Sequence, residues 1–183
     1  MPTVSVKIKA FEFITEKLLE WHASQNNNQQ NDFSKLKLFK LLFFVSAVNA
    51  SKDNDGLLDL FTSFCAMPYG PVESDVYNNF QDCKRVNISK EFTTLIDPID
   101  ENYYESIEEY KVKICNSIES LKIANNKLIN YSAYDLVELS HQWISWKSIF
   151  NLARLQNKLS LPIPSSIIKF EPKILKLTIN EFV

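Results

Sequence analysis

The stretch Ser34-Lys-Leu-Lys-Leu-Phe-Lys-Leu-Leu-Phe-Phe-Val-Ser-Ala-Val-Asn-Ala50 decides the fold of this chain. Its leucine, phenylalanine and valine side chains recur at helical spacing and also fill the positions between, so a helix formed here is apolar nearly all round. Such a helix has to lie at the centre of a domain, and Ser34 is suited to cap its N-terminus. Lys35, Lys37 and Lys40 must therefore reach the surface along their alkyl stems or meet a buried partner.

Amphipathic segments on both sides of the central helix predict further helices. Residues 6–24 place Ile, Phe, Leu and Trp on one face, and residues 105–129 repeat that pattern over a longer span. Ser132-Ala-Tyr-Asp135 resembles a capping box, with Asp where Glu is usual, and it predicts a helix that ends at His141. Another helix is expected over residues 145–155.

Short segments between the helices predict a small amount of β structure. Part of residues 57–67 is expected to be extended, and residues 87–96 could form a second short strand. In Pro68-Tyr-Gly-Pro-Val72 each proline favours an extended or turned backbone at the residue before it. Pro71 suits the first position of a new helix, because it needs no N–H there. The prediction is a mainly α fold with a small β element, which is the α+β class.

The length of 183 residues fits a single compact helical domain over residues 1–183. Residues 24–32 form a polar, Asn/Gln-rich loop, and too little chain precedes this loop to fold as a separate domain. Residues 159–183 form a proline-containing tail, with a helix expected around 173–181.

Composition and charge exclude several classes of protein. Apolar residues make up 45% of the chain, enough for a core without disulfides or a metal. The formal net charge of −2 lacks the basic footprint of nucleic-acid binding. Cys65, Cys83 and Cys115 are far apart, which predicts free buried thiols in a reducing compartment. The sequence offers neither a signal peptide nor a membrane span, so we expect a cytoplasmic protein without membrane contact, metal or cofactor.

Three blocks of sequence carry a family resemblance. Lys37-Leu-Phe-Lys-Leu-Leu-Phe-Phe44 resembles the motif KLQKLLYF. Phe64-Cys-Ala-Met-Pro-Tyr-Gly-Pro-Val-Glu-Ser-Asp-Val-Tyr-Asn-Asn-Phe80 is similar to F-x-A-x-x-Y-G-P-V-x-x-x-V-Y-x-x-F. Leu136-Val-Glu-Leu-Ser-His-Gln142, followed by Trp146, resembles L-x-x-L-[ST]-H with a downstream tryptophan. In this order the blocks resemble the SocA-like Panacea antitoxin domain, also found in phage-associated proteins, over residues 11–155.

The sequence departs from that family pattern at several positions. Phe39 stands in place of Gln and Phe43 in place of Tyr, which removes two polar groups from the central helix. His141 and Trp146 are separated by four residues, a longer link than the family motif leads us to expect. Residues 87–104 have no clear counterpart. These changes bear on partner identity more than on fold.

The resemblance implies a non-enzymatic antitoxin that neutralises a toxin encoded beside it. Its partner would be the cognate toxin protein, bound by direct contact or delivered to a bacterial protease. No nucleic-acid partner is expected, and a homodimer is compatible with the sequence. The alternative function is a phage-associated or DNA-binding transcriptional regulator, which would need a basic recognition helix.

The candidate partner-binding residues are the ones that would shape the family surface, Tyr69, Gly70, Pro71, His141 and Trp146, with Lys40 forming an ion pair beneath it. The Tyr-Gly-Pro segment favours a rigid corner between a strand and a helix, although backbone N–H groups freed by the glycine could also hold an anion. The neighbouring lysines favour a solvated helix face over a nucleic-acid stripe.

His141 is open to three interpretations. It could be a packing or hydrogen-bonding residue at a helix C-terminus, where its positive charge is favoured, or it could recognise a partner. A small enzyme would pair it with a nucleophile such as Cys65. Trp143, Trp146 and Phe150 share a helical face by spacing, which predicts core packing or, if exposed, an interface.

Overall fold

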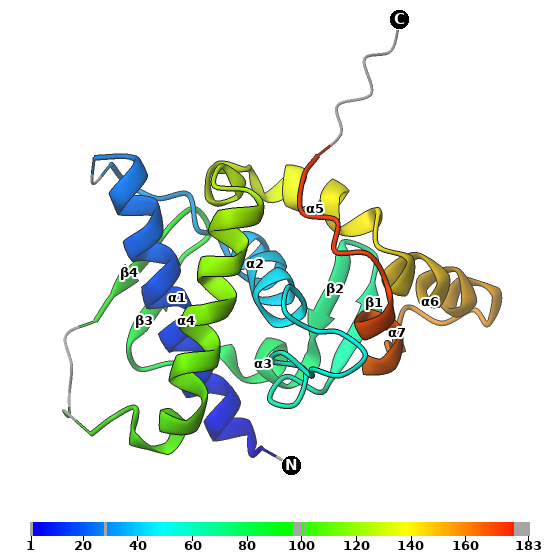
Figure 1. The fold of residues 1–183 in the computed structure, drawn as a ribbon, viewed down its shortest axis with the longest axis horizontal. Helices are drawn as coiled ribbons and strands as arrows, with labels where there is room; N and C mark the ends of the chain where they lie inside the picture. The colour runs from blue at the N-terminus through cyan, green and yellow to red at the C-terminus, as the bar shows by residue number, and fades with distance from the viewer. Residues whose placement is uncertain (1, 28, 97–99, 101, 178–183) are drawn as a thin grey trace, which may run out of the picture.

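The part of the chain that the structure describes contains seven α-helices and five short strands (Figure 1). The fold is therefore mainly α with a small β element, the α+β class that the sequence predicts. The structure is a computed structural model that describes residues 2–27, 29–96, 100 and 102–177. In chain order the helices are α1 (Val4–Gln25), α2 (Lys35–Ala47), α3 (Ser74–Asn79), α4 (Glu108–Ala124), α5 (Ala133–His141), α6 (Ile144–Leu155) and α7 (Ser165–Phe170).

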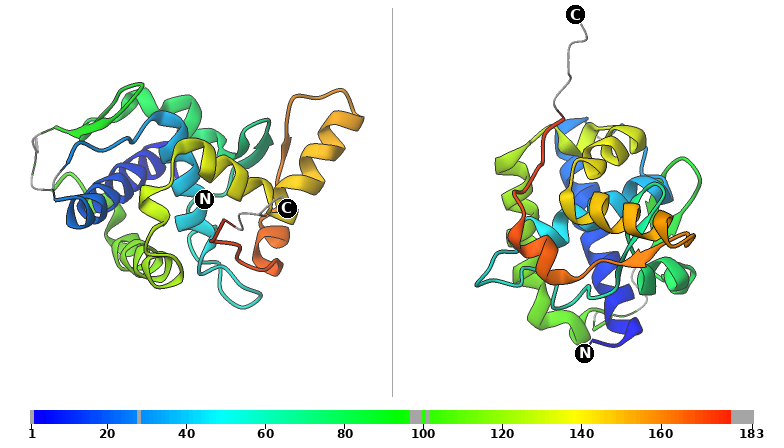
Figure 2. Two further views of the ribbon diagram at one scale, coloured as in Figure 1. Left: turned by 90° about the horizontal axis from the view of Figure 1, so that it is seen from above. Right: turned by 90° about the vertical axis from the view of Figure 1, so that its right-hand side faces the viewer.

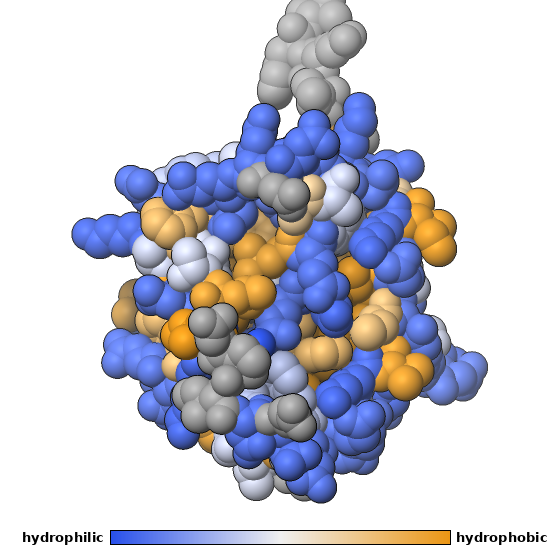
Figure 3. Space-filling view, turned by 90° about the vertical axis from the view of Figure 1, so that its left-hand side faces the viewer, coloured by the Kyte–Doolittle hydropathy of each residue, from blue (hydrophilic) through white to orange (hydrophobic). Residues whose placement is uncertain are grey.

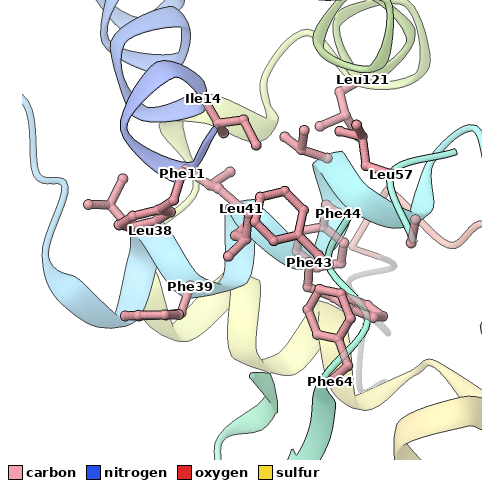
Figure 4. Packing of buried hydrophobic residues seen from close by; sticks show 14 of the residues in the cluster. Phe11, Ile14, Leu38, Phe39, Leu41, Phe43, Phe44, Leu57, Phe64 and Leu121 are labelled. Carbon is pink, nitrogen blue, oxygen red and sulfur yellow. The ribbon is translucent and has the colours of Figure 1, made fainter. Parts of the chain in front are cut away.

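Helix α2 is the centre of the fold, as its sequence predicts. All of its residues from Lys37 to Ala47 are buried, and Ser34 caps it by accepting a hydrogen bond from the Lys37 backbone N–H at 3.3 Å. The ring of Phe11 from α1 and that of Phe64 from β1 lie against its phenylalanines (Figure 4). The Phe39 ring stacks on Phe11 at 5.6 Å, and the Phe43 ring meets those of Phe64 and Trp143 edge-on. Fully burying each such side chain stabilises the fold by roughly 1.5–3 kcal/mol.

The strands form two small antiparallel sheets. The first has the order β2-β1-β5, and the second is the hairpin of β3 and β4. Residues 87–96, expected to form one short strand, thus contribute to two. The strands are β1 (Phe64–Met67), β2 (Gly70–Glu73), β3 (Val86–Ile88), β4 (Thr93–Leu95) and β5 (Leu161–Pro162).

The segment around Pro71 differs from its prediction. Pro71 lies inside strand β2, not at the start of a helix, and helix α3 begins only at Ser74. Met67 pairs with Gly70, so Pro68 and Tyr69 form a two-residue turn between β1 and β2. Proline at the second position and glycine at the fourth are preferred in β-turns, which explains why the chain reverses here.

Three other predictions need correction. The long helix expected over residues 105–129 is α4, which begins at Glu108 after a turn of 3-10 helix and ends at Ala124. In the tail, residues 173–177 are not helical, whereas α7 lies earlier, at Ser165–Phe170; residues 178–183 of the predicted helix lie outside the described residues. All three cysteines are free, but none is fully buried as predicted: Cys65 and Cys83 are half-buried and Cys115 is exposed.

Helix α1 is fixed by charged groups that are themselves buried. Lys7 is 2% exposed, and its Nζ donates to Glu73 at 2.7 Å and to Asp75 at 2.6 Å. One turn further on, Glu12 accepts hydrogen bonds from the Arg85 backbone N–H at 2.7 Å and from the Tyr103 hydroxyl at 2.6 Å. These contacts tie α1 to the end of β2 and to the start of β3.

Helix α6 lies at the end of the molecule opposite the β3–β4 hairpin. Figures 1 and 2 show it projecting from the body, with the chain returning along it into β5 and α7. The face that carries α1, β3 and β4 is covered mainly by hydrophilic side chains around small apolar areas (Figure 3).

Candidate partner-binding site

The turn between β1 and β2 carries the most exposed of the candidate residues. The Tyr69 side chain is 62% exposed at the tip, whereas the following Gly70 is buried. Gly70 has a φ of +100°, and a Cβ at this position would lie 2.3 Å from Ser140 Oγ and 2.9 Å from Lys40 Nζ. The position therefore requires glycine for two reasons, its left-handed backbone and the close approach of α5 and α2.

Lys40 supports the turn from below without an ion pair. Its side chain is fully buried, and Nζ donates to the Pro71 carbonyl at 2.8 Å. Among the described residues it has no acidic partner at ion-pair distance, so the predicted ion pair is wrong. Burial lowers the pKa of Lys40 to about 7, because an ammonium group is disfavoured away from water.

The other two lysines of α2 do not form the expected solvated face. Lys37 is fully buried and reaches Asp32 in the loop before the helix. The Lys35 Nζ lies 3.9 Å from the centre of the Tyr77 ring and 3.8 Å from that of Phe80. Each lysine has therefore found a separate partner, as an apolar helix at the centre of a domain requires.

Trp146 joins helix α6 to the turn. Its Nε1 donates to the Met67 carbonyl at 2.8 Å, and its side chain is 7% exposed. The His141 ring stacks on it with centroids 3.9 Å apart and planes 10° from parallel, and the Phe150 ring stacks at 5.0 Å. The stacked rings of His141 and Trp146 thus join the end of α5 to α6, and the hydrogen bond of Trp146 joins α6 to the turn.

The environment of His141 favours its neutral form. Burial has the largest effect on the pKa of His141 and lowers it. The carboxylate of Glu138 raises this pKa, the charge of Lys40 lowers it, and a hydrogen bond with the Pro68 carbonyl raises it, each to a smaller extent. His141 was expected to carry a positive charge at the C-terminus of its helix, and the structure favours the uncharged side chain instead. The Nε2 atom is buried and has no hydrogen-bond partner in the described structure. Burial also raises the pKa of the Cys65 thiol, which disfavours the thiolate that an enzyme would need.

The three-residue aromatic face expected on α6 is not formed. Trp143 is the N-cap residue of α6 and lies in the core, with its Nε1 donating to the Ile174 carbonyl at 2.9 Å. The helix thus starts between Trp143 and Trp146, which separates their side chains. His141 takes the place expected for Trp143 in the cluster with Trp146 and Phe150.

The structure brings the six candidate residues together, and it adds two that the sequence did not single out. Ser140 contacts the site through the close approach to Gly70, and Met67 offers the carbonyl for Trp146. Ser140 directly precedes His141 in the L-x-x-L-[ST]-H pattern, so that motif was the signal for it. Nothing in the sequence identifies a backbone carbonyl such as that of Met67.

The described residues hold no group of three or more His, Cys, Asp or Glu side chains arranged for a metal ion. In that part of the chain, no helix combines the length and the apolar character needed to cross a membrane.

Comparison with known protein families gives a match. The family described as "Antitoxin SocA-like, Panacea domain" matches residues 38–147, more than half of the chain and a span that contains all six candidate residues. No curated protein and no solved structure matches the chain. The chain belongs to the antitoxin SocA-like, Panacea domain family.

Proposed function

We propose that this protein is a non-catalytic antitoxin that neutralises a cognate toxin protein by binding it through the β1–β2 turn. The observation that supports this is the contrast at Tyr69, whose side chain is 62% exposed although the backbone around it is held from three sides. Lys40 holds the carbonyl of Pro71, Trp146 holds that of Met67, and Ser140 packs against Gly70.

A rigid turn with an exposed tyrosine suits protein recognition. Tyrosine is enriched among the residues that carry most of the binding energy at interfaces. Association also costs free energy for ordering loops, and a turn that is already fixed avoids that cost. His141 and Trp146 would act mainly by holding the turn and by forming the edge of the contact surface, with the protein working in the cytoplasm.

The test is growth of cells that express the neighbouring reading frame with and without this protein. Tyr69→Ala should weaken protection and toxin binding by about tenfold or more, the effect of losing a hot-spot residue. Tyr134→Ala is the matched control, since Tyr134 is also exposed, at 71%, but lies on α5 away from the turn. Protection that is equal in the two variants would contradict the role of the turn.

A second measurement separates direct inhibition from delivery to a protease. Purified toxin that is inhibited by the purified protein supports direct contact, whereas protection that is lost only in protease-deficient cells supports delivery. A harmless neighbouring gene, together with a salt-sensitive shift of DNA in a gel, would favour the transcriptional regulator instead.

A further inference from the structure

The segment that follows the site differs in charge from the rest of the chain. Between residues 143 and 176 the sequence has six Lys or Arg side chains and one Glu, a formal charge of +5, whereas the whole chain carries −2. Three of these cations, Lys147, Arg154 and Lys158, are exposed on or next to α6. Within the described part of the chain they make no ion pair.

The same segment exposes large apolar side chains. The exposed fractions are 58% for Ile144, 44% for Leu152, 83% for Leu155, 85% for Leu159 and 67% for Phe170. Single exposed apolar residues are ordinary on a protein surface, but a gathering of them on one unit marks an interaction site. We call the surface formed by these five residues the α6–α7 surface.

Helical geometry places most of this surface on one side of α6. Ile144, Leu152 and Leu155 are separated by eight and three residues, spacings that bring side chains to the same helix face. At the N-terminal end of α6, Ile144 and Phe170 line an open groove of about 480 Å³ together with Ile167 and Pro172. The surface thus has a helix face on which exposed apolar side chains stand among the polar Ser148 and Asn151, and a concave end.

The one acidic residue of the segment is occupied within the protein. Glu171 accepts hydrogen bonds from the Ser145 backbone N–H at 2.8 Å and from the Ser145 hydroxyl, so it caps the first turn of α6. Lys169 pairs with Asp55, and Lys173 donates to the Ile168 carbonyl. The exposed cations of the segment are therefore Lys147, Arg154 and Lys158, beside the exposed leucines, and Lys176, near the end of the described chain.

From this arrangement we infer that the α6–α7 surface is a docking surface for an acidic, partly apolar face of the cognate toxin. This inference rests on the proposed function and places a second contact beyond the β1–β2 turn. Cations around an apolar centre match the usual plan of an interface, which has an apolar core and a polar rim. Four of its five residues, Leu152, Leu155, Leu159 and Phe170, lie C-terminal to the residues that match the family.

Other occupants fit this surface less well. A second copy of the chain bound through the same surface would place the cations of the two copies against each other. A nucleic acid would use the cations but leave Leu152, Leu155 and Leu159 in water, because phosphates offer them no apolar contact. A lipid surface would bury the leucines but leave the groove between Ile144 and Phe170 without an occupant.

The experiment measures binding of the full-length protein to the purified product of the neighbouring gene by calorimetry. Leu155→Asp and Lys158→Glu test the apolar and the charged parts of the surface. Ile123→Asp is the control for the first variant, because Ile123 is 87% exposed near the end of α4, as Leu155 is 83% exposed at the end of α6. Lys127→Glu, at an exposed lysine after α4, is the control for the second.

Each variant on the α6–α7 surface should weaken binding by about tenfold, and each control by less than about twofold. Added salt should reduce the difference between Lys158→Glu and the wild type, since screening weakens exposed charge pairs. Circular dichroism and thermal melting establish that all four variants are folded; if Leu155→Asp is not, Lys158→Glu carries the test.

The outcomes separate this inference from the proposed function. If the wild type binds the toxin and all four variants bind equally well, the docking surface is overturned while the proposed function stands. If the wild type does not bind, both fall. The wild type could instead bind anionic phospholipid vesicles or a DNA duplex. If Leu155→Asp and Lys158→Glu abolished that binding and left toxin binding unchanged, the surface would belong to that partner. Concentration-dependent dimers abolished by Leu155→Asp would assign it to a second copy.

Discussion

Helix α1 and helix α6 use their charged residues in opposite ways. On α1 the charged groups of Lys7 and Glu12 are buried, and each is satisfied by several partners from distant parts of the chain. On α6 the cations Lys147 and Arg154 point to solvent, next to exposed leucines. The buried charges of α1 hold that helix in one position in the fold. The exposed charges of α6 remain available to bind a partner.

This difference follows from the cost of removing charges from water. A buried charge is tolerated only when it is paired and hydrogen-bonded, so each partner becomes essential to the fold. An exposed charge contributes little to stability and can be changed at small cost. Substitutions of the buried charged residues on α1 are therefore predicted to reduce the stability of the fold strongly. Substitutions of the exposed residues on α6 are predicted to affect only binding.

The largest expected effect comes from breaking the network that holds α1. Glu73→Ala removes one of the two acidic partners of Lys7 and also the acceptor for the Val76 backbone N–H, which caps α3 at 2.8 Å. We expect a loss of about 3–5 kcal/mol in the free energy of unfolding, measured by urea denaturation, since a buried cation loses a partner.

A matched control for that variant is Glu119→Ala, which removes the exposed ion pair of Glu119 with Lys122 on α4. It should change the free energy of unfolding by less than about 1 kcal/mol. If Glu73→Ala cost no more than this control, the buried network would not be what fixes α1.

The next largest effect is expected at the turn, between the two regions. Gly70→Ala places a methyl group against Ser140 Oγ and Lys40 Nζ at a φ of +100°. Strain of this kind costs about 1–3 kcal/mol, which chemical denaturation can measure. Adding Ser140→Ala should recover only part of the loss, because the backbone strain remains. A full recovery would show that the hydroxyl contact alone makes glycine necessary.

The buried Lys40 predicts a dependence of stability on pH. Its folded pKa, about 7, lies below its ordinary value of 10.5, so between these values the unfolded chain binds a proton that the folded chain does not. The free energy of unfolding should therefore rise with pH from about 7 to about 10, by at most about 1.4 kcal/mol per pH unit.

Comparison with Lys40→Met isolates this contribution. The thiols of Cys65 and Cys83, whose pKa values burial raises, act with the opposite sign in the same range, but they are present in both proteins. The difference between the two pH profiles should therefore show the slope of Lys40. Parallel profiles would mean that Lys40 keeps its proton in the folded protein.

Features set by local sequence were predictable in this chain. The apolar run of α2, its Ser34 cap and the capping box of Ser132 with Asp135 all appear as expected, because each depends on residues within one or two turns. The six candidate site residues were reached through the family motifs, and the structure places them side by side. Their hydrogen bonds were not predictable, because carbonyls of Met67 and Pro71 accept them.

Most of the wrong predictions have a non-local cause. Pro71 fits the start of a helix as well as a strand, and pairing of β2 with β1 decided between the two. Lys40 and Lys35 look solvated in the sequence, but the Pro71 carbonyl and the Tyr77 ring, from other segments, are their partners. Only Lys37 has a nearby partner, Asp32 in the loop before the helix. Composition and spacing contain no information on which loop will cover a helix.

The smallest expected effect sharpens the contrast with α1. Leu155→Asp should change the free energy of unfolding by less than about 0.5 kcal/mol, because a side chain that is 83% exposed loses little packing on substitution. Asp near a helix C-terminus is slightly unfavourable through the helix dipole, so Leu155→Gln is the better measure of packing alone. A loss near that of Glu73→Ala would mean that the end of α6 is held by contacts within the chain. A stable variant would instead leave this leucine free to contact a partner.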